Sequence, residues 1–209
     1  NQVRLTSNAL DDDAPRWCGN SRLVYSQDGA IVEMDAADLD GDGNGDNRVT
    51  IVAGSNDRYN HSVDCSASSI VFLRNEPGLH VVLADRSGGN EMYLGGGEML
   101  IFEQPRFSPD GNRIVFGSNL ADASMSVRDI YVMDAVDTDN DQQGDNLQRV
   151  TTSNSGSGSS NPVWSPDGGF VAYSRNSGNY YEIRKAALGN GTDTQVVPSP
   201  PNGFAGDWQ

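Results

Sequence analysis

The sequence predicts an all-β protein assembled from repeated four-stranded antiparallel sheets. The turn-forming residues Gly, Asn, Asp and Ser are abundant, with 24 Gly among 209 residues. Short β-branched and aromatic stretches alternate with these turn residues and leave almost no room for helix. The same succession of stretches returns about every 45 residues, which is the period of a β-propeller blade.

The first two strands of each predicted blade carry the clearest repeat. Two copies match closely, PRFSPDGNRIVFGS at 105–118 and PVWSPDGGFVAYS at 162–174. A degenerate copy, PRWCGNSRLVYS, lies at 15–26, and a weaker one, VDCSASSIVFL, lies at 63–73. Ser-Pro-Asp-Gly predicts a tight turn between the two strands, because Pro fixes φ and Gly accepts a positive φ.

Two further apolar stretches follow each copy and predict the third and fourth strands. The third strands are expected at 31–36, 80–85, 129–135 and 180–186, and the fourth at 47–52, 91–94, 148–152 and 194–198. The four blades are therefore predicted over about 15–53, 63–95, 105–152 and 162–198. We expect the aromatic anchors of the first strands to pack between blades rather than to stack on sugars; they are Trp17, Phe107, Trp164 and Trp208.

The repeat supports a resemblance to a known family. The pattern P-x-W-S-P-D-G, followed by I-A-F-x-S, I-Y-V-M-D and R-L-T, resembles the repeat of TolB-like propellers, also called WD40-like PD40 repeats. The resemblance covers essentially the whole chain. It is specific in the copies that start at Pro105 and Pro162, eroded at Pro15 and weak near Val63. The resemblance implies protein–protein interaction in the bacterial envelope or outside the cell.

The two ends of the chain predict parts of a further blade. Residues 1–6 are expected to form its outer strand and residues 204–209 its inner strand, without the two strands between them. Three explanations stay open for this incomplete blade. The chain is a fragment of a longer propeller, or it closes on itself as a single propeller domain, or its ends complete a blade with a neighbouring chain in an oligomer or filament.

The charge balance limits the partners. The chain has 14 Lys and Arg against 29 Asp and Glu, which gives a formal net charge of −15 at pH 7. Such a charge repels phosphates, so it excludes nucleic acid and anionic membrane surfaces as partners. No apolar run approaches the length of a membrane span, so membrane insertion is not expected.

The densest acidic segments form one loop that occurs in two blades. Both copies follow a Met-Asp-Ala strand end and precede the fourth strand. D-x-D-x-D-G is the first half of an EF-hand-type calcium loop, whose alternate carboxylates point to one centre. The predicted Ca²⁺ ligands are Asp38, Asp40, Asp42, Asn44 and Asp46 in the first loop and Asp137, Asp139, Asp141, Gln143 and Asp145 in the second.

Both loops depart from the EF-hand pattern. Val49 stands where the bidentate Glu belongs, and Gln142 stands in the second loop where the turn Gly belongs. These departures predict weak binding, with dissociation constants of about 10⁻⁴–10⁻³ M, as in extracellular modules. Mg²⁺ is less favoured because it keeps its waters. The alternative is a flexible acidic loop that only water solvates.

Other candidate sites are less specific. Cys18 and Cys65 occupy equivalent places in adjacent repeats and are expected either to form a disulfide between blades or to remain two buried thiols. Asn60 and Asn190 begin glycosylation sequons, which matter only if the source glycosylates its proteins.

The sequence gives little support for catalysis. His61 and His80 are the only histidines, and neither a G-x-S-x-G nor an H-E-x-x-H motif occurs. We therefore expect no enzyme, but an exported calcium-binding propeller that acts as a protein-binding or scaffold module in an extracellular or periplasmic setting. One alternative is a self-assembling extracellular subunit. The other is a carbohydrate-binding or polysaccharide-lyase-like propeller, because the resemblance extends to such lyases.

Overall fold

The structure is a computed structural model that describes residues 2–97, 100–122, 127–154, 157–189 and 193–196. Within these residues the chain forms four separate antiparallel sheets, each of four strands in sequence order. The fold-class prediction of four-stranded propeller blades is thereby confirmed.

Blade 1 contains β1 (Asp12–Cys18), β2 (Arg22–Gln27), β3 (Ala30–Asp35) and β4 (Val49–Val52). Blade 2 contains β5 (Tyr59–Cys65), β6 (Ser69–Glu76), β7 (Gly78–Asp85) and β8 (Met92–Gly97). Blade 3 contains β9 (Phe102–Phe107), β10 (Arg113–Ser118), β11 (Asp129–Asp134) and β12 (Gln148–Arg149). Blade 4 contains β13 (Gly158–Trp164), β14 (Phe170–Asn176), β15 (Tyr181–Ala187) and β16 (Asp193–Gln195).

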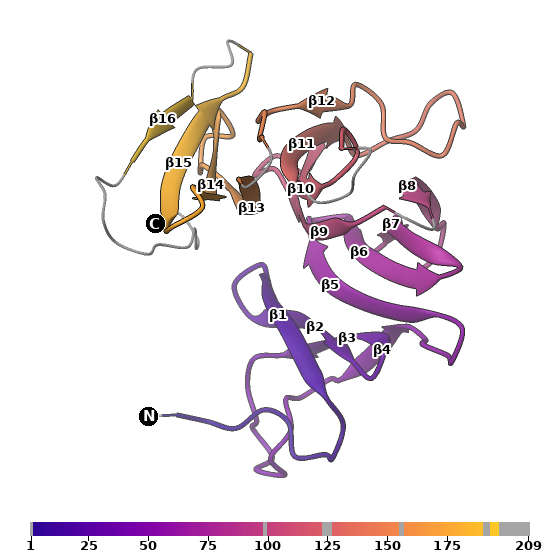
Figure 1. The fold of residues 1–209 in the computed structure, drawn as a ribbon. Coiled ribbons are helices and arrows are strands. Elements are labelled where there is room, and N and C mark those ends of the chain that lie inside the picture. The colour runs from indigo at the N-terminus through magenta and orange to yellow at the C-terminus, as the bar shows by residue number, and fades with distance from the viewer. Residues whose placement is uncertain (1, 98–99, 123–126, 155–156, 190–192, 197–209) are drawn as a thin grey trace.

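The blades follow one another around an arc (Figure 1). The first strands β1, β5, β9 and β13 lie on the inner side, and the fourth strands β4, β8, β12 and β16 lie on the outer side. Within the described residues, no hydrogen-bonded strand pair joins one blade to another. Side-chain packing, together with isolated hydrogen bonds and one disulfide, therefore holds the blades together.

Hydrophobic cores fill the spaces between successive blades. Between blades 2 and 3, Val71, Leu73 and Val81 pack against Phe107, Phe116 and Met133. Equivalent clusters join blade 1 to blade 2 and blade 3 to blade 4. Each sheet thus uses alternate side chains on its two faces for its two neighbours, as the period of two in a strand requires.

Every inner strand contains the same irregularity. One residue adopts a positive φ of about 50°, and the pairing with the second strand shifts at that place. A β-bulge of this kind bends a strand and increases its local twist. The four residues are Ala14, Ser62, Gln104 and Asn161.

The expected packing of the aromatic anchors holds for two residues and is wrong for Trp17. Phe107 and Trp164 are each 8% exposed, whereas Trp17 is 63% exposed. Trp164 packs on the preceding blade, because its Nε1 donates to the Arg106 carbonyl oxygen at 3.0 Å and the Arg113 guanidinium lies 4.8 Å from its ring. No preceding blade within the described residues offers Trp17 such a surface. Trp208 lies outside the described residues.

The outer strand predicted for residues 1–6 is not formed by residues 2–6, but this segment does pack on the free face of blade 1. Leu5 packs against a cluster formed by Tyr25, Val32 and Met34, all of which are buried. Residues 2–7 form no strand. They nonetheless cover part of one face of blade 1. On blades 2 and 3 the sheet of the preceding blade covers the equivalent face. The segment 204–209, predicted as the inner strand of the same blade, lies outside the described residues.

Candidate metal centre

The two acidic loops connect the third and fourth strands of blades 1 and 3, and their backbones are closed by the same hydrogen bonds. The Asp35 amide donates to the Asp46 carbonyl oxygen at 2.8 Å, and the Asp134 amide donates to the Asp145 carbonyl oxygen at the same distance. A second pair of bonds also matches. The Asp46 amide donates to the Ala37 carbonyl oxygen and the Asp145 amide to the Val136 carbonyl oxygen, both at 2.8 Å. The register between the loops that the sequence predicts therefore exists in the folded chain.

A glycine is required near the end of each loop. A Cβ on Gly45 would lie 2.5 Å from the Asp35 carbonyl oxygen, and a Cβ on Gly144 would lie 2.8 Å from the Asp134 carbonyl oxygen. Neither distance is tolerable for a carbon atom, so each loop can return to its sheet only through a residue without a side chain.

The first carboxylate of each loop holds the turn together. The two carboxylate oxygens of Asp38 accept from the Gly41 amide at 2.8 Å and the Gly43 amide at 3.0 Å. The two oxygens of Asp137 accept from the Asp141 amide at 3.2 Å and the Gln142 amide at 2.9 Å. Asp137 is buried by these contacts. This arrangement fixes the chain around a centre toward which further carboxylates turn.

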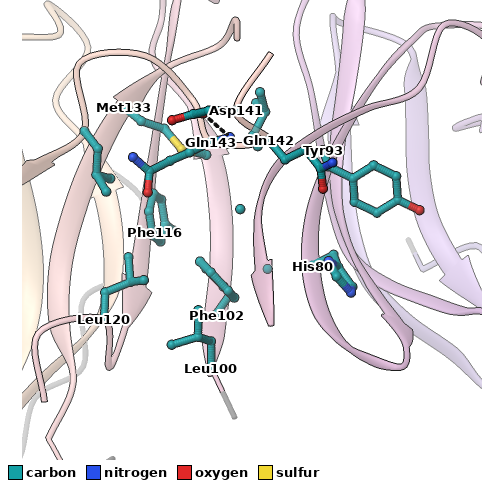
Figure 2. A pocket seen from close by; sticks show the side chains of 14 residues that line it. His80, Tyr93, Leu100, Phe102, Phe116, Leu120, Met133, Asp141, Gln142 and Gln143 are labelled. Atoms are coloured by element: carbon teal, nitrogen blue, oxygen red, sulfur yellow. Dashed lines mark hydrogen bonds between the residues drawn. The ribbon is translucent and has the colours of Figure 1, made fainter. Parts of the chain in front are cut away.

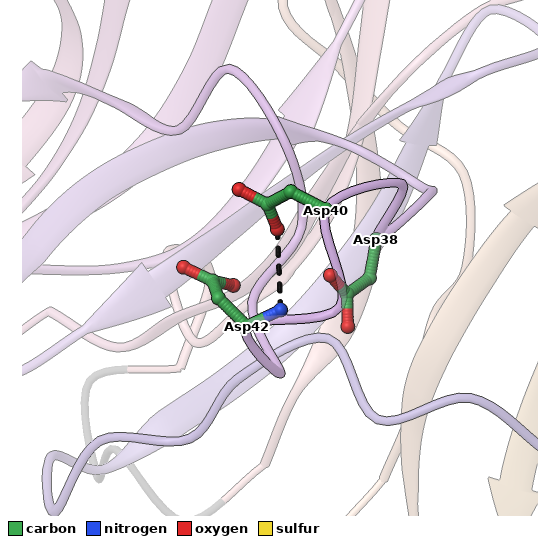
Figure 3. Close-up of side chains that lie close together, drawn as sticks. All are labelled: Asp38, Asp40 and Asp42. Atoms are coloured by element: carbon green, nitrogen blue, oxygen red, sulfur yellow. Dashed lines mark hydrogen bonds between the residues drawn. The ribbon is translucent and has the colours of Figure 1, made fainter.

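Three carboxylates converge in each loop. In the first loop Asp38, Asp40 and Asp42 bring oxygen atoms within 4.8 Å of one another, and Figure 3 shows the three side chains around the turn. In the second loop the converging carboxylates are those of Asp137, Asp139 and Asp145, again within 4.8 Å. The two clusters share their first and third positions and differ in the remaining one.

The four other predicted ligands lie outside these clusters. Asp46 accepts from the Leu39 amide at 3.0 Å, and Asp141 accepts from the Gln143 amide at 2.8 Å. The Asn44 Oδ1 atom accepts from the amide and the hydroxyl of Ser7, each at 3.1 Å, so it ties the loop to the N-terminal segment. Gln143 lies on the wall of a cavity between blades 2 and 3.

The clustered charges repel one another. Carboxylates held within 4.8 Å of one another repel, and water screens the repulsion between the exposed members of each cluster. The charge of Asp141 raises the pKa of Asp139 above its ordinary value, with smaller contributions from desolvation and from a hydrogen bond with Asp137. A cation at the centre would reverse this repulsion.

The donor set fits a hard divalent cation. Every clustered donor is a carboxylate oxygen, and no histidine or cysteine belongs to either cluster. Ca²⁺ takes about six to eight oxygen ligands, many of them from backbone carbonyls and water. The three carboxylates of each loop would supply the charged part of such a shell, and water and main chain would supply the rest.

The two cysteines form a disulfide between blades. Cys18 ends β1 and Cys65 ends β5, and their Cα atoms are 5.8 Å apart. Ser108 and Ser165 occupy the equivalent positions of blades 3 and 4 and are buried. The bond therefore joins the inner edges of blades 1 and 2 at a place where the fold accepts a small polar residue.

The structure does not present Asn60 as a glycan acceptor. Its side chain is fully buried; Nδ2 donates to the Gly29 carbonyl oxygen at 2.7 Å, and Oδ1 accepts from Arg74 Nε at 2.8 Å. A glycan on Nδ2 would break these contacts, so the sequon does not mark a modification site in the folded protein. Asn190, the other predicted acceptor, lies outside the described residues.

The two histidines lie in different strands and bond locally. His61 Nδ1 lies 3.1 Å from the hydroxyl of its neighbour Ser62, and His80 Nε2 lies 3.2 Å from the Pro77 carbonyl oxygen. Burial lowers the pKa of His61, and the charge of Asp13 opposes the shift.

The described residues contain no helix with the length and hydropathy that crossing a bilayer requires.

Comparison with known proteins identifies the fold. No protein-family model and no curated protein matches the sequence. Solved structures do match: TolB from Acinetobacter baumannii is 18% identical with a TM-score of 0.68 over 94% of this chain and 46% of its own. An oligogalacturonate lyase from Vibrio parahaemolyticus is 14% identical with a TM-score of 0.63 over 87% of this chain and 51% of its own. A prolyl endopeptidase is 12% identical with a TM-score of 0.64 over 91% of this chain and 30% of its own.

These similarities confirm the resemblance at the level of fold. The chain has a TolB-like β-propeller fold and spans about half the length of the TolB and lyase structures that it matches. The same fold occurs in proteins whose names describe enzymes and in TolB, so function must be argued from this chain's own sites.

Proposed function

We propose that the protein is an exported, non-catalytic propeller module that binds Ca²⁺ in its two acidic loops and offers its surface to a protein partner. The observation that supports this most strongly is the repeated loop. Two segments almost 100 residues apart share their backbone hydrogen bonds, and each brings three carboxylates within 4.8 Å. In both loops a cation would relieve the repulsion between the converging carboxylates.

The loops are placed where a cation would stabilise contacts between blades. The Gly144 amide of the second loop donates to the Leu94 carbonyl oxygen of β8 at 3.1 Å, which joins blade 3 to blade 2. The Gly45 amide of the first loop donates to the Leu5 carbonyl oxygen at 2.8 Å. A bound cation would hold each loop in the conformation that makes these bonds, so metal binding and blade packing would reinforce one another.

Export is supported by two independent features. Disulfides persist in oxidising compartments, and Cys18–Cys65 is one. Weak calcium sites fill only where calcium is abundant, and a loop without the bidentate Glu belongs to that class. Both features favour an extracellular or periplasmic setting.

The proposed partner surface lies at the end of the blades opposite the acidic loops. There Arg128, which precedes β11, meets β13 through a hydrogen bond from the Ser159 amide to the Arg128 carbonyl oxygen at 2.8 Å. A polar cavity of about 230 Å³ opens between them. Its lining residues are Arg128, Ser157, Gly158, Ser159, Ser160, Asn176 and Tyr181. Hydroxyls, amides and one guanidinium suit the polar side chains of a protein partner better than an apolar ligand.

The histidines support the absence of catalysis. His61 and His80 contact the adjacent Ser62 and the main chain of Pro77, and neither lies in the acidic clusters. They therefore do not supply the clustered imidazoles that a metal-dependent lyase would need. Carbohydrate binding stays a prediction that no structural observation favours.

Two experiments test the proposal. Thermal unfolding with Ca²⁺ and with a chelator tests the metal: a higher midpoint with Ca²⁺ is expected, and equal midpoints would contradict the metal sites.

Affinity capture from the source's secreted fraction tests the partner surface. A partner captured by the wild type and lost with Arg128→Glu is expected, and an unchanged set of captured proteins would contradict this surface. Leu39→Glu, at an 87% exposed position on an acidic loop, is the matched control.

A second candidate function is self-assembly, and the N-terminal segment favours it. Leu5 takes the place on blade 1 that Leu94 of β8 takes on blade 3, while Trp17 stays 63% exposed on the inner edge. Residues 2–7 thus take the place of an outer strand without forming one, and no inner strand within the described residues covers Trp17. A second copy of the chain would supply that inner strand. Light scattering at high protein concentration should then show oligomers that Trp17→Glu dissociates, and a strict monomer would contradict assembly.

A further inference from the structure

A cavity of about 260 Å³ opens between the outer halves of blades 2 and 3 (Figure 2). Blade 2 contributes residues of β7 and β8, and blade 3 contributes residues of β9, β10 and β11. The second acidic loop closes one end through Asp141, Gln142 and Gln143. The cavity adjoins the second acidic loop but contains none of the three carboxylates that converge there.

The floor of the cavity is apolar. Leu94, Phe102, Phe116 and Met133 line it, and all four are buried. The two phenylalanine rings have their centroids 5.6 Å apart and are tilted by 43°. Half-buried Leu100, Leu120 and Leu147 extend this lining toward the mouth. Such a surface gains free energy by exchanging water for an apolar molecule.

The cavity exists because one of its walls has no side chains. β8 ends in three consecutive glycines, and Gly95 and Gly96 face the cavity with bare backbone. A Cβ on Gly95 would lie 3.4 Å from the Phe102 ring, and a Cβ on Gly96 would collide with the His80 ring. This run of glycines thus keeps a space open beside two aromatic rings.

The rim is polar. Asp141, Gln142 and Gln143 lie at one end, and His80 and Tyr93 lie on the blade 2 side, with their ring centroids 5.3 Å apart. The carboxylate can accept a hydrogen bond from a molecule seated on the floor, and the two side-chain amides can accept or donate one. The carboxylate at the mouth and the chain's net charge of −15 disfavour anions.

We propose that this cavity is a binding site for a small, neutral aromatic molecule that carries one hydrogen-bond donor. The size of the cavity sets the size of the ligand. A dry protein cavity of about 150 Å³ accepts benzene, so about 260 Å³ accommodates a fused bicyclic ring. The flat ring would lie against Phe102 and Phe116, and its donor would reach the amide and carboxylate groups of the rim.

Indole is the probe, because it is neutral, bicyclic and has one N–H donor. Titration is followed by NMR of ¹³C-methyl-labelled methionine, since the Met133 side chain lines the floor. Met34 is an internal control. It occupies the same position in blade 1 as Met133 does in blade 3, and it does not line this cavity. We expect a saturable shift of the Met133 methyl signal, with a dissociation constant from micromolar to low millimolar, and an unchanged Met34 signal.

Two variants close the cavity from its mouth. Leu120→Trp and Gln143→Trp should each weaken indole binding at least tenfold, and the exposed position of Gln143 protects the second variant from failing to fold. Leu39→Trp, on the exposed tip of the first acidic loop, should bind indole like the wild type. An absent or unsaturable Met133 shift, equal shifts of both methionines, or binding unchanged in both closing variants would overturn the proposal.

Discussion

The carbonyl oxygen of Leu5 accepts a hydrogen bond from the Gly45 amide at 2.8 Å, and this bond repeats the one between Leu94 and the Gly144 amide at 3.1 Å. Leu94 belongs to the outer strand of blade 2, whereas Leu5 precedes the first strand of the chain. The N-terminal segment forms no strand, but it takes the place on blade 1 that β8 takes on blade 3. It also links the first acidic loop to the hydrophobic face that it covers.

Removing the Leu5 side chain should destabilise blade 1. Leu5→Ala should lower the free energy of unfolding by about 1–2 kcal/mol, less than the ~2–5 kcal/mol that a fully buried leucine costs, because Leu5 is only partly buried. Urea denaturation measures the change. Leu94→Ala should cost more than Leu5→Ala, and Leu39→Ala should change little. Equal effects of Leu5→Ala and Leu39→Ala would show that the segment does not pack as described.

Gln142 is strained in the second acidic loop. Its φ is 67°, a left-handed conformation that costs about 1 kcal/mol for a residue with a side chain. The first loop has Gly43 at this position with a φ of 82°. Gln142→Gly should therefore raise the free energy of unfolding by about 0.5–1 kcal/mol, measured by chemical denaturation. Gln143→Gly, at a position without a positive φ, should lower or preserve stability, and the opposite order would contradict the strain.

Breaking the disulfide should cost stability without changing the fold. Cys18 and Cys65 are 47 residues apart in sequence, so the bond restricts a long loop of the unfolded chain. The double variant Cys18→Ser, Cys65→Ser should lose about 2–4 kcal/mol. Reduced wild type should unfold at the same denaturant concentration as this variant. A variant as stable as the oxidised wild type would refute the contribution of the bond.

Asp64 should make stability depend on pH. Burial raises its pKa, against opposing hydrogen bonds from the amides of Phe107 and Cys65 and the charge of Arg106. Because the pKa is higher in the folded state, the folded protein binds the proton more tightly, and the destabilising effect of Asp64 declines as pH falls through the folded-state pKa. It is absent below the unfolded-state pKa of about 3.9.

Asp64→Asn tests this dependence. Asparagine keeps an oxygen that can accept from the Phe107 amide, which lies 2.8 Å from the Asp64 carboxylate, and it removes the buried charge. The variant should be more stable than the wild type at pH 7–8, and the difference should vanish near pH 4. Denaturant titrations at several pH values measure it. A constant difference across this range would show that Asp64 does not titrate as described.

The sequence sufficed for the parts of the molecule that depend on local periodicity. Alternating strands, turn residues and the two acidic loops all follow from residues close together in the chain. The places where sequence reasoning failed depend on neighbours in space. Trp17 matches Trp164 in its local motif, but no preceding blade in the described part of the chain packs against it. Asn60 matches a sequon, yet Arg74 and the Gly29 carbonyl oxygen enclose it.

The cation sites show the same division. The spacing of the carboxylates predicted a common centre, and Asp38, Asp40 and Asp42 do converge. It could not predict that Asn44 would bond to Ser7, because that contact requires a segment 37 residues earlier in the chain. The cavity beside Phe102 also escaped prediction, since it depends on β8 glycines facing another blade. Local patterns specify what a residue can do, and packing decides whether it is free to do it.

Calcium titration by isothermal calorimetry tests the central claim most directly. We expect two weak sites in the wild type, with dissociation constants of about 10⁻⁴–10⁻³ M, and a stabilisation of about 1.4–2.7 kcal/mol per loop at about 10 mM Ca²⁺. Asp38→Asn with Asp40→Asn should remove one site, and Asp137→Asn with Asp139→Asn the other. A titration with no binding heat, joined to an unfolding midpoint that Ca²⁺ leaves unchanged, would contradict it.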